Sequence, residues 1–378
     1  MLCSLSTSCD ARDDTAQNDI PQREKSHKNS LTKSHEHAHE KSSPHHADED
    51  AQASALQRDT TVAWYMTMHD SGARDPVTEQ ESVFGFGLDG NATGGVLAKV
   101  PDVEGALQDL RGMLSLTDGT LLVISAWKHN TQILRFGPPD AAGRRPFIEV
   151  FARSGDDNPL MVHPYAMAIA PDGSILVSNQ DSNTVTRYGA PNTALAGKPL
   201  RCDGGVDGDA NNAGLVVPSH EMDKRGVKEV RGIAVAPDGT LFVADRGKGE
   251  VTRWNITTGE HLGVVVSKKD GIETPIQLLI QADGTRMFIS DNKRNEVFVY
   301  PLSVSTSEAR SRVFLDASAG IDATSSLAID DNHLYVGSRK AREILRFRIS
   351  DGQPDATPFI ANLPDNPEFF VANLKKTP

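Results

Sequence analysis

The stretch VRGIAVAPDGTLFVADRGKGEVTRW, residues 230–254, decides the fold of this chain. It contains two apolar runs joined at Asp238-Gly239, then a polar loop and a third apolar run. Short apolar runs separated by turn residues are typical of antiparallel strands. We therefore predict a unit of three strands here.

The same layout recurs four more times along the chain. The copies are residues 110–136, 164–188, 275–300 and 324–347. Their turn aspartates, with that of the first stretch, are Asp118, Asp172, Asp238, Asp283 and Asp331, which are 54, 66, 45 and 48 residues apart. Repeats of this length that carry several strands each are typical of propeller blades.

The turns predict two-residue hairpins with positive φ, a conformation that glycine and asparagine tolerate. The residues expected to adopt it are Gly119, Gly173, Gly239, Gly284 and Asn332. A fourth strand is expected after each unit, in RPFIEVFA (145–152), KPLRC (198–202), HLGVVVS (261–267), RVFLDA (312–317) and TPFIANL (357–363). Trp64, Trp127 and Trp254 are expected to pack within the blades.

A sixth blade can be assembled from both ends of the repeat region. NPEFFVAN (366–373) supplies its inner strand, and TTVAWYMTM (60–68), SVFGFGL (82–88) and GVLAKV (95–100) supply the other three. Such closure removes the open sheet edges that would favour aggregation. The predicted fold is therefore all-β, a six-bladed β-propeller over residues 60–378 whose ring is closed by N- and C-terminal strands.

Residues 1–59 predict a disordered, His-rich tail. They contain six of the twelve histidines and no Phe, Trp or Tyr, so they offer too little apolar area to offset the entropy of ordering. His35, His37 and His39 within this tail form a weak candidate site for a metal such as zinc, because neutral imidazoles are good ligands for it.

Composition limits the partners of the chain. The net charge is −12 and no cluster of Lys and Arg is present, so nucleic acid is not an expected partner. No apolar run is long enough to span a membrane. The three cysteines cannot form a disulfide framework, and we expect a monomer.

The stretch STSCD, residues 6–10, resembles the cleavage box of a bacterial lipoprotein, in which Cys9 would be lipidated. It departs from that pattern because Ser6 stands where Leu is usual and no apolar stretch precedes it. If translation starts upstream, the resemblance favours an exported or cell-envelope protein.

The phrases VAPDGTLFVAD, IAPDGSILVSN and DGGVDGDANNAGLVVPS resemble NHL repeats and the related gluconolactonase-like six-bladed propellers, over about residues 62–373. This resemblance implies the fold. It leaves function open, because such propellers include lactonases, lyases and binding modules.

Ligand sites of propellers usually lie at one mouth of the central channel, near the start of the inner strands. Seven residues before each turn aspartate stand Arg111, Tyr165, Arg231, Ile276 and Thr324, and Glu368 completes the ring by its position after a proline. Two guanidiniums, a phenol and a carboxylate suit a small anionic or sugar-like ligand, or a protein. The alternative is structural, with Arg111 and Arg231 paired to Glu368 or capping loops.

The resemblance also implies two enzymatic alternatives. Gluconolactonase-like hydrolases hold calcium with a Glu, two Asn and an Asp, and Glu368 is the only residue of the counted ring that matches this set. A zinc-dependent lyase would use histidines such as His163, with His69, His129, His220 and His333, but no pair of them has ligand spacing. We therefore expect a binding module, with the metal-dependent hydrolase as the alternative.

Two further features of the repeat predict structural roles. Arg135, Arg187, Arg253 and Arg346 recur before the third-strand aromatic and are expected to pair with loop carboxylates such as Asp245. Asp245 and Asp291, at the ends of second strands, are expected to accept hydrogen bonds from loop N–H groups.

Overall fold

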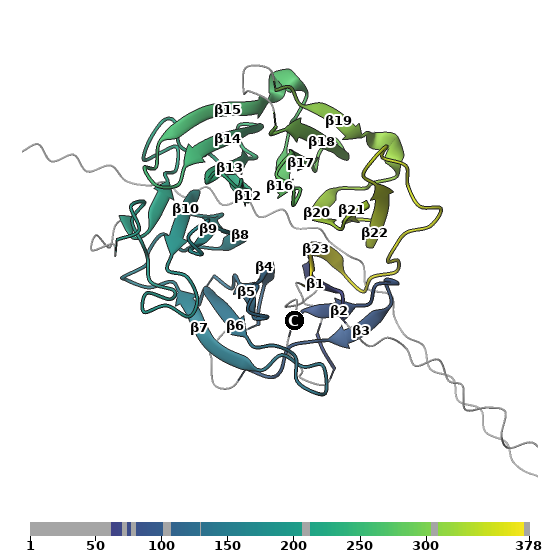
Figure 1. Cartoon of the computed structure of the whole chain (residues 1–378), viewed down its shortest axis with the longest axis horizontal. Coiled ribbons are helices and arrows are strands. Elements are labelled where there is room, and N and C mark those ends of the chain that lie inside the picture. Colours follow the sequence, from purple (N-terminus) through teal and green to yellow (C-terminus); the bar gives the residue numbers. More distant parts are fainter. Residues whose placement is uncertain are drawn as a thin grey trace, which may run out of the picture. The chain divides into compact units, whose positions relative to one another are not determined.

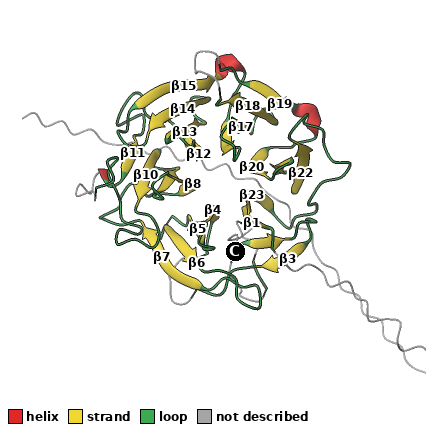
Figure 2. Cartoon of the chain, viewed as in Figure 1, coloured by secondary structure: helices red, strands yellow, loops and turns green. Residues whose placement is uncertain are grey.

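The computed structural model describes residues 62–69, 74–76, 81–100, 107–128, 130–205, 212–303 and 309–373. These residues form six antiparallel sheets arranged around a central axis, as Figure 1 shows. Loops connect the strands, together with 3₁₀ turns such as η2 (Lys268–Asp270) and η3 (Ala317–Ala319) (Figure 2). The predicted all-β six-bladed propeller is confirmed.

Each blade is one sheet, and the first strand named for each blade below is the innermost; in blade six that strand is β23, from the C-terminal end of the repeat region. Blade one consists of β4 (Leu110–Ser115), β5 (Leu121–Ser125), β6 (Gln132–Phe136) and β7 (Phe147–Arg153), and blade two of β8 (Pro164–Ile169), β9 (Ile175–Asn179), β10 (Thr184–Tyr188) and β11 (Leu215–Val217). Blade three consists of β12 (Val230–Val235), β13 (Thr240–Asp245), β14 (Glu250–Asn255) and β15 (His261–Ser267), and blade four of β16 (Pro275–Ile280), β17 (Arg286–Asp291), β18 (Glu296–Pro301) and β19 (Arg312–Leu315). Blade five consists of β20 (Thr324–Ile329), β21 (His333–Ser338) and β22 (Glu343–Arg348), and blade six of β23 (Asn366–Ala372), β1 (Trp64–His69), β2 (Phe84–Phe86) and β3 (Ala92–Gly95).

The ring closes as predicted, by pairing of the C-terminal strand β23 with the N-terminal strand β1. Tyr65 lies opposite Val371 in this antiparallel pair, and the ladder runs over the whole of β1. Trp64 stacks on Phe370 of the partner strand at 4.9 Å between ring centroids. Blade six is therefore held by both backbone and aromatic contacts.

Three of the predicted outer strands are wrong. In blade two the fourth strand is β11 rather than 198–202, because Pro199 has no N–H to donate and forms only an isolated bridge with Tyr188. In blade five the segment 357–363 contributes only the bridge between Ile344 and Ile360, which leaves three strands. In blade six the last strand is β3, which overlaps the predicted 95–100 only at Gly95.

The hairpin turns of blades one to four are longer than the expected two-residue type, which is found in blade five. In blade one the Gly119 N–H donates to Leu116 O at 3.0 Å and the Leu116 N–H donates to Thr120 O at 2.9 Å, so the loop has three residues. Gly119 has the expected positive φ, 85°, as the last residue of that loop. Blade five has the shorter turn, with the Asp330 N–H donating to His333 O at 3.0 Å, and Asn332 does not adopt positive φ.

The core lies between successive blades. Trp254 and Trp64 are buried as predicted, with 2% and 3% exposure, whereas Trp127 is only half-buried beside a surface pocket.

The predicted role of the second-strand aspartates is confirmed. Asp245 accepts from the Lys228 and Glu229 N–H groups, and Asp291 accepts likewise at the start of blade four.

Candidate functional site at the channel mouth

Every inner strand begins with a β-bulge, and the bulged residues form a ring around the axis. In blade one, Leu110 pairs with Ser125 and Met113 with Val123, so two residues oppose one at Arg111. Bulges re-aim a side chain and often lie beside functional sites. The corresponding ring residues are Arg111, Tyr165, Arg231, Ile276, Ser325 and Glu368.

The structure corrects the predicted ring at one position. In blade five Thr324 pairs with Ser338 and Leu327 with Val336, so Thr324 corresponds to Leu110 and Ser325 corresponds to Arg111. The count back from the turn aspartate fails here because this hairpin is one residue shorter. The other five predicted positions coincide with the bulges.

Tyr165 lies at the centre of the interactions among the ring residues. Its ring packs against Phe369 of blade six at 5.2 Å between centroids, and the guanidinium of Arg231 lies 5.7 Å from its ring centroid. Within the described residues its hydroxyl has no hydrogen-bond partner. Burial raises the pKa of this phenol, and the nearby Glu368 carboxylate raises the pKa further, so the hydroxyl stays protonated.

The two ring arginines pair within their own blades rather than with Glu368. Arg111 Nη2 lies 3.1 Å from Asp109 Oδ1, and Arg231 Nη2 lies 2.8 Å from Glu229 Oε1. Burial lowers the pKa of Arg231, and Glu229 opposes that effect. Each arginine therefore has a carboxylate two residues before it, which was not among the predicted partners.

Glu368 faces a different cation, Arg339, which directly follows strand β21. Arg339 Nη2 lies 3.8 Å from Glu368 Oε2, beyond hydrogen-bond distance. That oxygen is buried and accepts no hydrogen bond from any residue in the described part of the chain. Neighbouring inner strands also carry buried polar atoms without a partner among the described residues: Gln277 Nε2, Thr324 Oγ1 and Ser326 Oγ.

His163 also contacts a ring residue of the mouth, although it lies outside the predicted ring. Its Nε2 is 3.2 Å from Arg111 Nη2 and its Nδ1 is 3.2 Å from Asp181 Oδ2. The backbone of His163 has φ 50°, as Asp109 has φ 55° at the equivalent place, and their carbonyls accept from Gln180 and Ala126. Asp109, His163 and Glu229 each stand two residues before a bulged ring residue. Sequence reasoning did not consider this spacing, which would have predicted the three side chains to lie at the mouth.

The oxygen donors at the mouth do not suit the calcium ion that the resemblance implies. Glu368 is the only carboxylate among the ring residues, and the Arg339 guanidinium lies beside it, where a cation would be repelled. Among the described residues, no three His, Cys, Asp or Glu side chains are grouped so that they could hold a metal. The residues of the mouth therefore do not fit a calcium ion.

The remaining predicted histidines are dispersed. His69 lines a pocket of about 200 Å³ beside Arg111 and Trp127, and His333 lies in the hairpin at the opposite end of blade five. His220 lies in the loop between β11 and β12. His129, the tail residues His35, His37 and His39, Cys9 and the predicted boundary at 59/60 lie outside the described residues.

Solved structures with the same architecture come from proteins of different kinds. A chain of a nidogen/laminin complex matches with a TM-score of 0.57 and 10% identity, over 84% of this chain and 100% of that chain. A protein from Lactobacillus plantarum matches with a TM-score of 0.51 and 14% identity, over 79% and 82%. A protein from Bacteroides fragilis NCTC 9343, provisionally assigned as a 6-phosphogluconolactonase, matches with a TM-score of 0.50 and 12% identity, over 82% and 85%.

The six sheets define the chain as a six-bladed β-propeller, and these similarities bear on the fold alone. No protein-family model matches the sequence, and no curated protein matches it. In the described part of the chain, no helix is both long and apolar enough to cross a membrane.

Proposed function

We propose that the protein binds a small polyhydroxylated, sugar-like ligand at the channel mouth, with Arg111, Tyr165, Arg231 and Glu368 as its contacts. One observation carries this proposal: the Oε2 atom of Glu368 is buried at the ring and accepts no hydrogen bond from the described residues. Buried carboxylate oxygens are ordinarily hydrogen-bonded, so a donor from outside the chain is expected there.

The balance of charge favours hydroxyl groups over a simple anion. Arg111 and Arg231 are already paired with Asp109 and Glu229, so the positive charges of these two guanidiniums are balanced within the chain. A ligand hydroxyl group can both donate and accept hydrogen bonds. It can therefore donate to the Glu368 carboxylate and accept from the Tyr165 hydroxyl. A carboxylate on the same ligand would add a contact to the arginines.

The test compares three probes by isothermal titration calorimetry. D-glucitol and D-gluconate carry the hydroxyl pattern without and with an anion, and butyrate carries an anion without hydroxyls. We expect the two hydroxylated probes to bind and butyrate not to bind. Binding of butyrate alone would overturn the proposal in favour of a simple anion site.

Two variants assign the binding to named atoms. Tyr165→Phe removes only a hydroxyl that has no partner in the described structure, so stability should change by less than about 1 kcal/mol while affinity falls about tenfold. Glu368→Gln should reduce affinity by a similar factor. If both variants bind as tightly as the parent chain, the ligand lies elsewhere.

The hydrolase alternative is tested in the same preparation. Turnover of a sugar lactone that requires calcium and disappears in Glu368→Ala would overturn the binding-only function. Absence of turnover, combined with binding of the hydroxylated probes, supports the binding module.

A further inference from the structure

A clamp of three side chains stabilises the hairpin end of the first two blades. In blade one, Arg135 donates from Nη2 to Asp118 Oδ2 at 2.9 Å and from Nε to Thr120 Oγ1 at 3.4 Å. In blade two, Arg187 makes the same contacts with Asp172 and Ser174. The two arginines are each only 5% exposed. The predicted pairing of repeat arginines with loop carboxylates is therefore confirmed in these two blades, and also for Arg346, which pairs with Asp355 in blade five, although Asp245 is not a partner.

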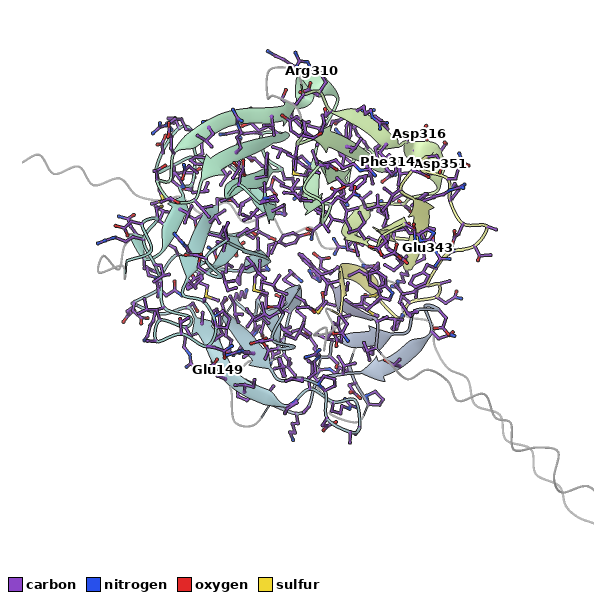
Figure 3. The ribbon with its side chains drawn as sticks, in the orientation of Figure 1. Glu149, Arg310, Phe314, Asp316, Glu343 and Asp351 are labelled. Carbon is purple, nitrogen blue, oxygen red and sulfur yellow. The ribbon has the colours of Figure 1, made fainter. Side chains whose placement is uncertain are left out.

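Further contacts close the clamp in blade one. Glu149 on the outer strand β7 (Figure 3) lies 3.2 Å from Arg135 Nη1. Asn192, from blade two, contacts both Arg135 and Asp118, at 2.7 and 2.8 Å. This crevice between blades one and two is thus filled by protein side chains.

Blade three has the same residues at the same places, but its clamp is open. Asp238 and Thr240 occupy the turn positions, and Arg253 occupies the third strand. The Nε of Arg253 donates instead to the Leu262 carbonyl on β15 at 2.9 Å. Within the described residues, the Asp238 carboxylate accepts only from the Thr240 N–H, at 2.9 Å.

The residue opposite the arginine offers a physical reason for this difference. Arg253 pairs across the strands with Phe242, where Arg135 and Arg187 pair with Leu122 and Leu176. Directly opposed side chains on neighbouring strands contact each other. The larger ring of Phe242 therefore obstructs the path of the Arg253 side chain toward Asp238, while the carboxylate itself still borders open space.

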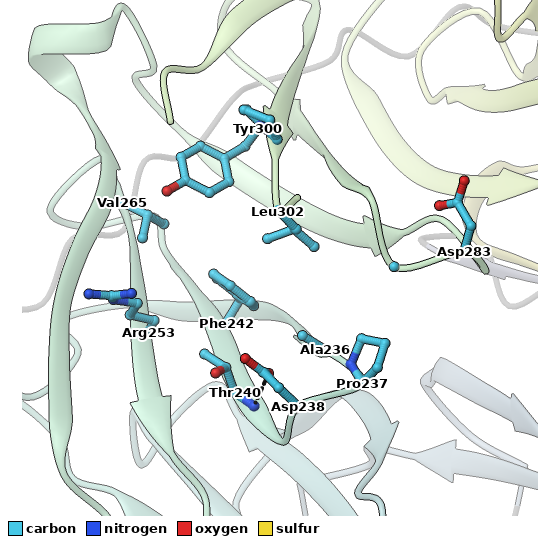
Figure 4. Close-up of a pocket in the computed structure, with 12 residues that line it drawn as sticks. Ala236, Pro237, Asp238, Thr240, Phe242, Arg253, Val265, Asp283, Tyr300 and Leu302 are labelled. Atoms are coloured by element: carbon cyan, nitrogen blue, oxygen red, sulfur yellow. Dashed lines mark hydrogen bonds between the residues drawn. The ribbon is translucent and has the colours of Figure 1, made fainter. Parts of the chain in front are cut away.

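A pocket of about 480 Å³ lies beside the open clamp, between blades three and four. Figure 4 shows Phe242 and Leu302 between Asp238 on one side and Tyr300 on the other. Asp283, from the next hairpin, adds a second carboxylate to the lining. The pocket lies at the end of the inner strands opposite the channel mouth and shares no residue with it.

We propose that this pocket binds an alkylguanidinium group, as carried by an arginine side chain of a peptide or by free arginine. The head group takes the place on Asp238 and Thr240 that Arg135 and Arg187 take in the first two blades. Its aliphatic stem lies on Phe242 and Leu302, as the stems of long cationic side chains commonly lie on apolar surface. The ligand thus completes a clamp for which the chain already supplies the carboxylate.

The probe is N-acetyl-arginine amide, titrated into the full chain and followed by calorimetry. We expect a dissociation constant on the order of 1 mM, because one charged contact and a short stem provide limited affinity. N-acetyl-citrulline amide has nearly the same shape without the charge, and we expect it to bind at least about tenfold more weakly. Equal binding of the two probes, or no binding of the arginine probe up to 20 times that concentration (~20 mM), would overturn the proposal.

Asp238→Asn keeps an acceptor for the Thr240 N–H and removes the charge, so the affinity for the arginine probe should fall about tenfold. Asp118→Asn is the matched control, because Arg135 and Asn192 already occupy that carboxylate, and it should leave binding unchanged. Equal effects of the two variants would place the probe elsewhere. Thermal melts establish that both variants are folded.

A second variant tests the reason for the opening. Phe242→Leu restores the residue found in blades one and two, so Arg253 can reach Asp238 and compete with the probe. We expect binding to be lost although the carboxylate is retained, and undiminished binding would contradict the proposed role of the ring. Titration of free arginine beside N-acetyl-arginine amide distinguishes the two sources of the alkylguanidinium group. Free arginine carries an additional ammonium and carboxylate group, so tighter binding of the amide indicates a peptide side chain and tighter binding of free arginine indicates the amino acid.

Discussion

Arg145 of blade one donates from both Nε and Nη2 to the phenol oxygen of Tyr65 in blade six, at 3.0 and 2.6 Å. Its Nη1 also donates to the carbonyls of Gly119 and Gly137, each at 2.8 Å. Both side chains are buried, and the guanidinium lies 4.9 Å from the Tyr65 ring centroid. This arginine joins the blade that closes the ring to the blade that follows it.

We expect Arg145→Met to lower the free energy of unfolding by about 3 kcal/mol, because it leaves a buried hydroxyl and two carbonyls without donors. Urea denaturation of Arg145→Met, Tyr65→Phe and the double variant measures the coupling, expected at about 1 to 2 kcal/mol. Arg225→Met, at an exposed ion pair, is the control and should show no measurable change. Strict additivity of the two changes would show that the contact does not couple the blades.

Closure of the ring through β23 predicts a second stability effect. Phe370 is 1% exposed and stacks on Trp64, so Phe370→Ala should destabilise the chain by about 4 kcal/mol through the cavity it leaves. Removal of residues 366–378 should be more damaging, since blade six then lacks its inner strand. Thermal melting of both variants checks this, and a truncated chain that melts with the parent would refute the closure.

The tyrosines predict a loss of stability at alkaline pH. Burial raises the pKa of all five: Tyr65, Tyr165, Tyr188, Tyr300 and Tyr335. The pKa of Tyr188, for example, rises to about 12. In the unfolded chain these phenols ionise near pH 10, so the native state binds more protons above that pH.

Stability from these groups is therefore complete below about pH 10 and declines as the pH rises through the folded-state pKa values. For a fully buried phenol the slope is up to about 1.4 kcal/mol per pH unit. Absorbance at the phenolate band should show little ionisation of the native protein at pH 10 and about half in denaturant. Half-ionisation of the native protein at that pH would contradict the burial of these hydroxyls.

The repeat made the blades predictable because the Asp-Gly turns and the apolar runs are local signals. Closure by 366–373 was predictable for the same reason, since NPEFFVAN matches the other first strands. Outer strands were less predictable. Pro199 in 198–202 cannot donate to a ladder, and the true edge strand β11 lies beyond a Gly- and Asp-rich segment.

The mouth was predictable in position but not in its pairings. Counting from the turns placed Arg111, Tyr165, Arg231, Ile276 and Glu368 at the bulges, and it failed in blade five, where the hairpin is one residue shorter. The partners Asp109, Glu229 and Arg339 depend on which rotamers meet across loops. Asp109 and Glu229 do share a spacing, two residues before the ring arginine, which the count from the turns did not consider, whereas Arg339 reaches Glu368 from the neighbouring blade.

The strand that closes the ring also carries a ring residue of the mouth. Glu368 lies on β23, which is synthesised after all the strands of blades one to five. A nascent chain that has made blades one to five still has a gap in its ring and lacks the carboxylate of the mouth. Closure of the propeller and completion of the mouth therefore depend on the same strand.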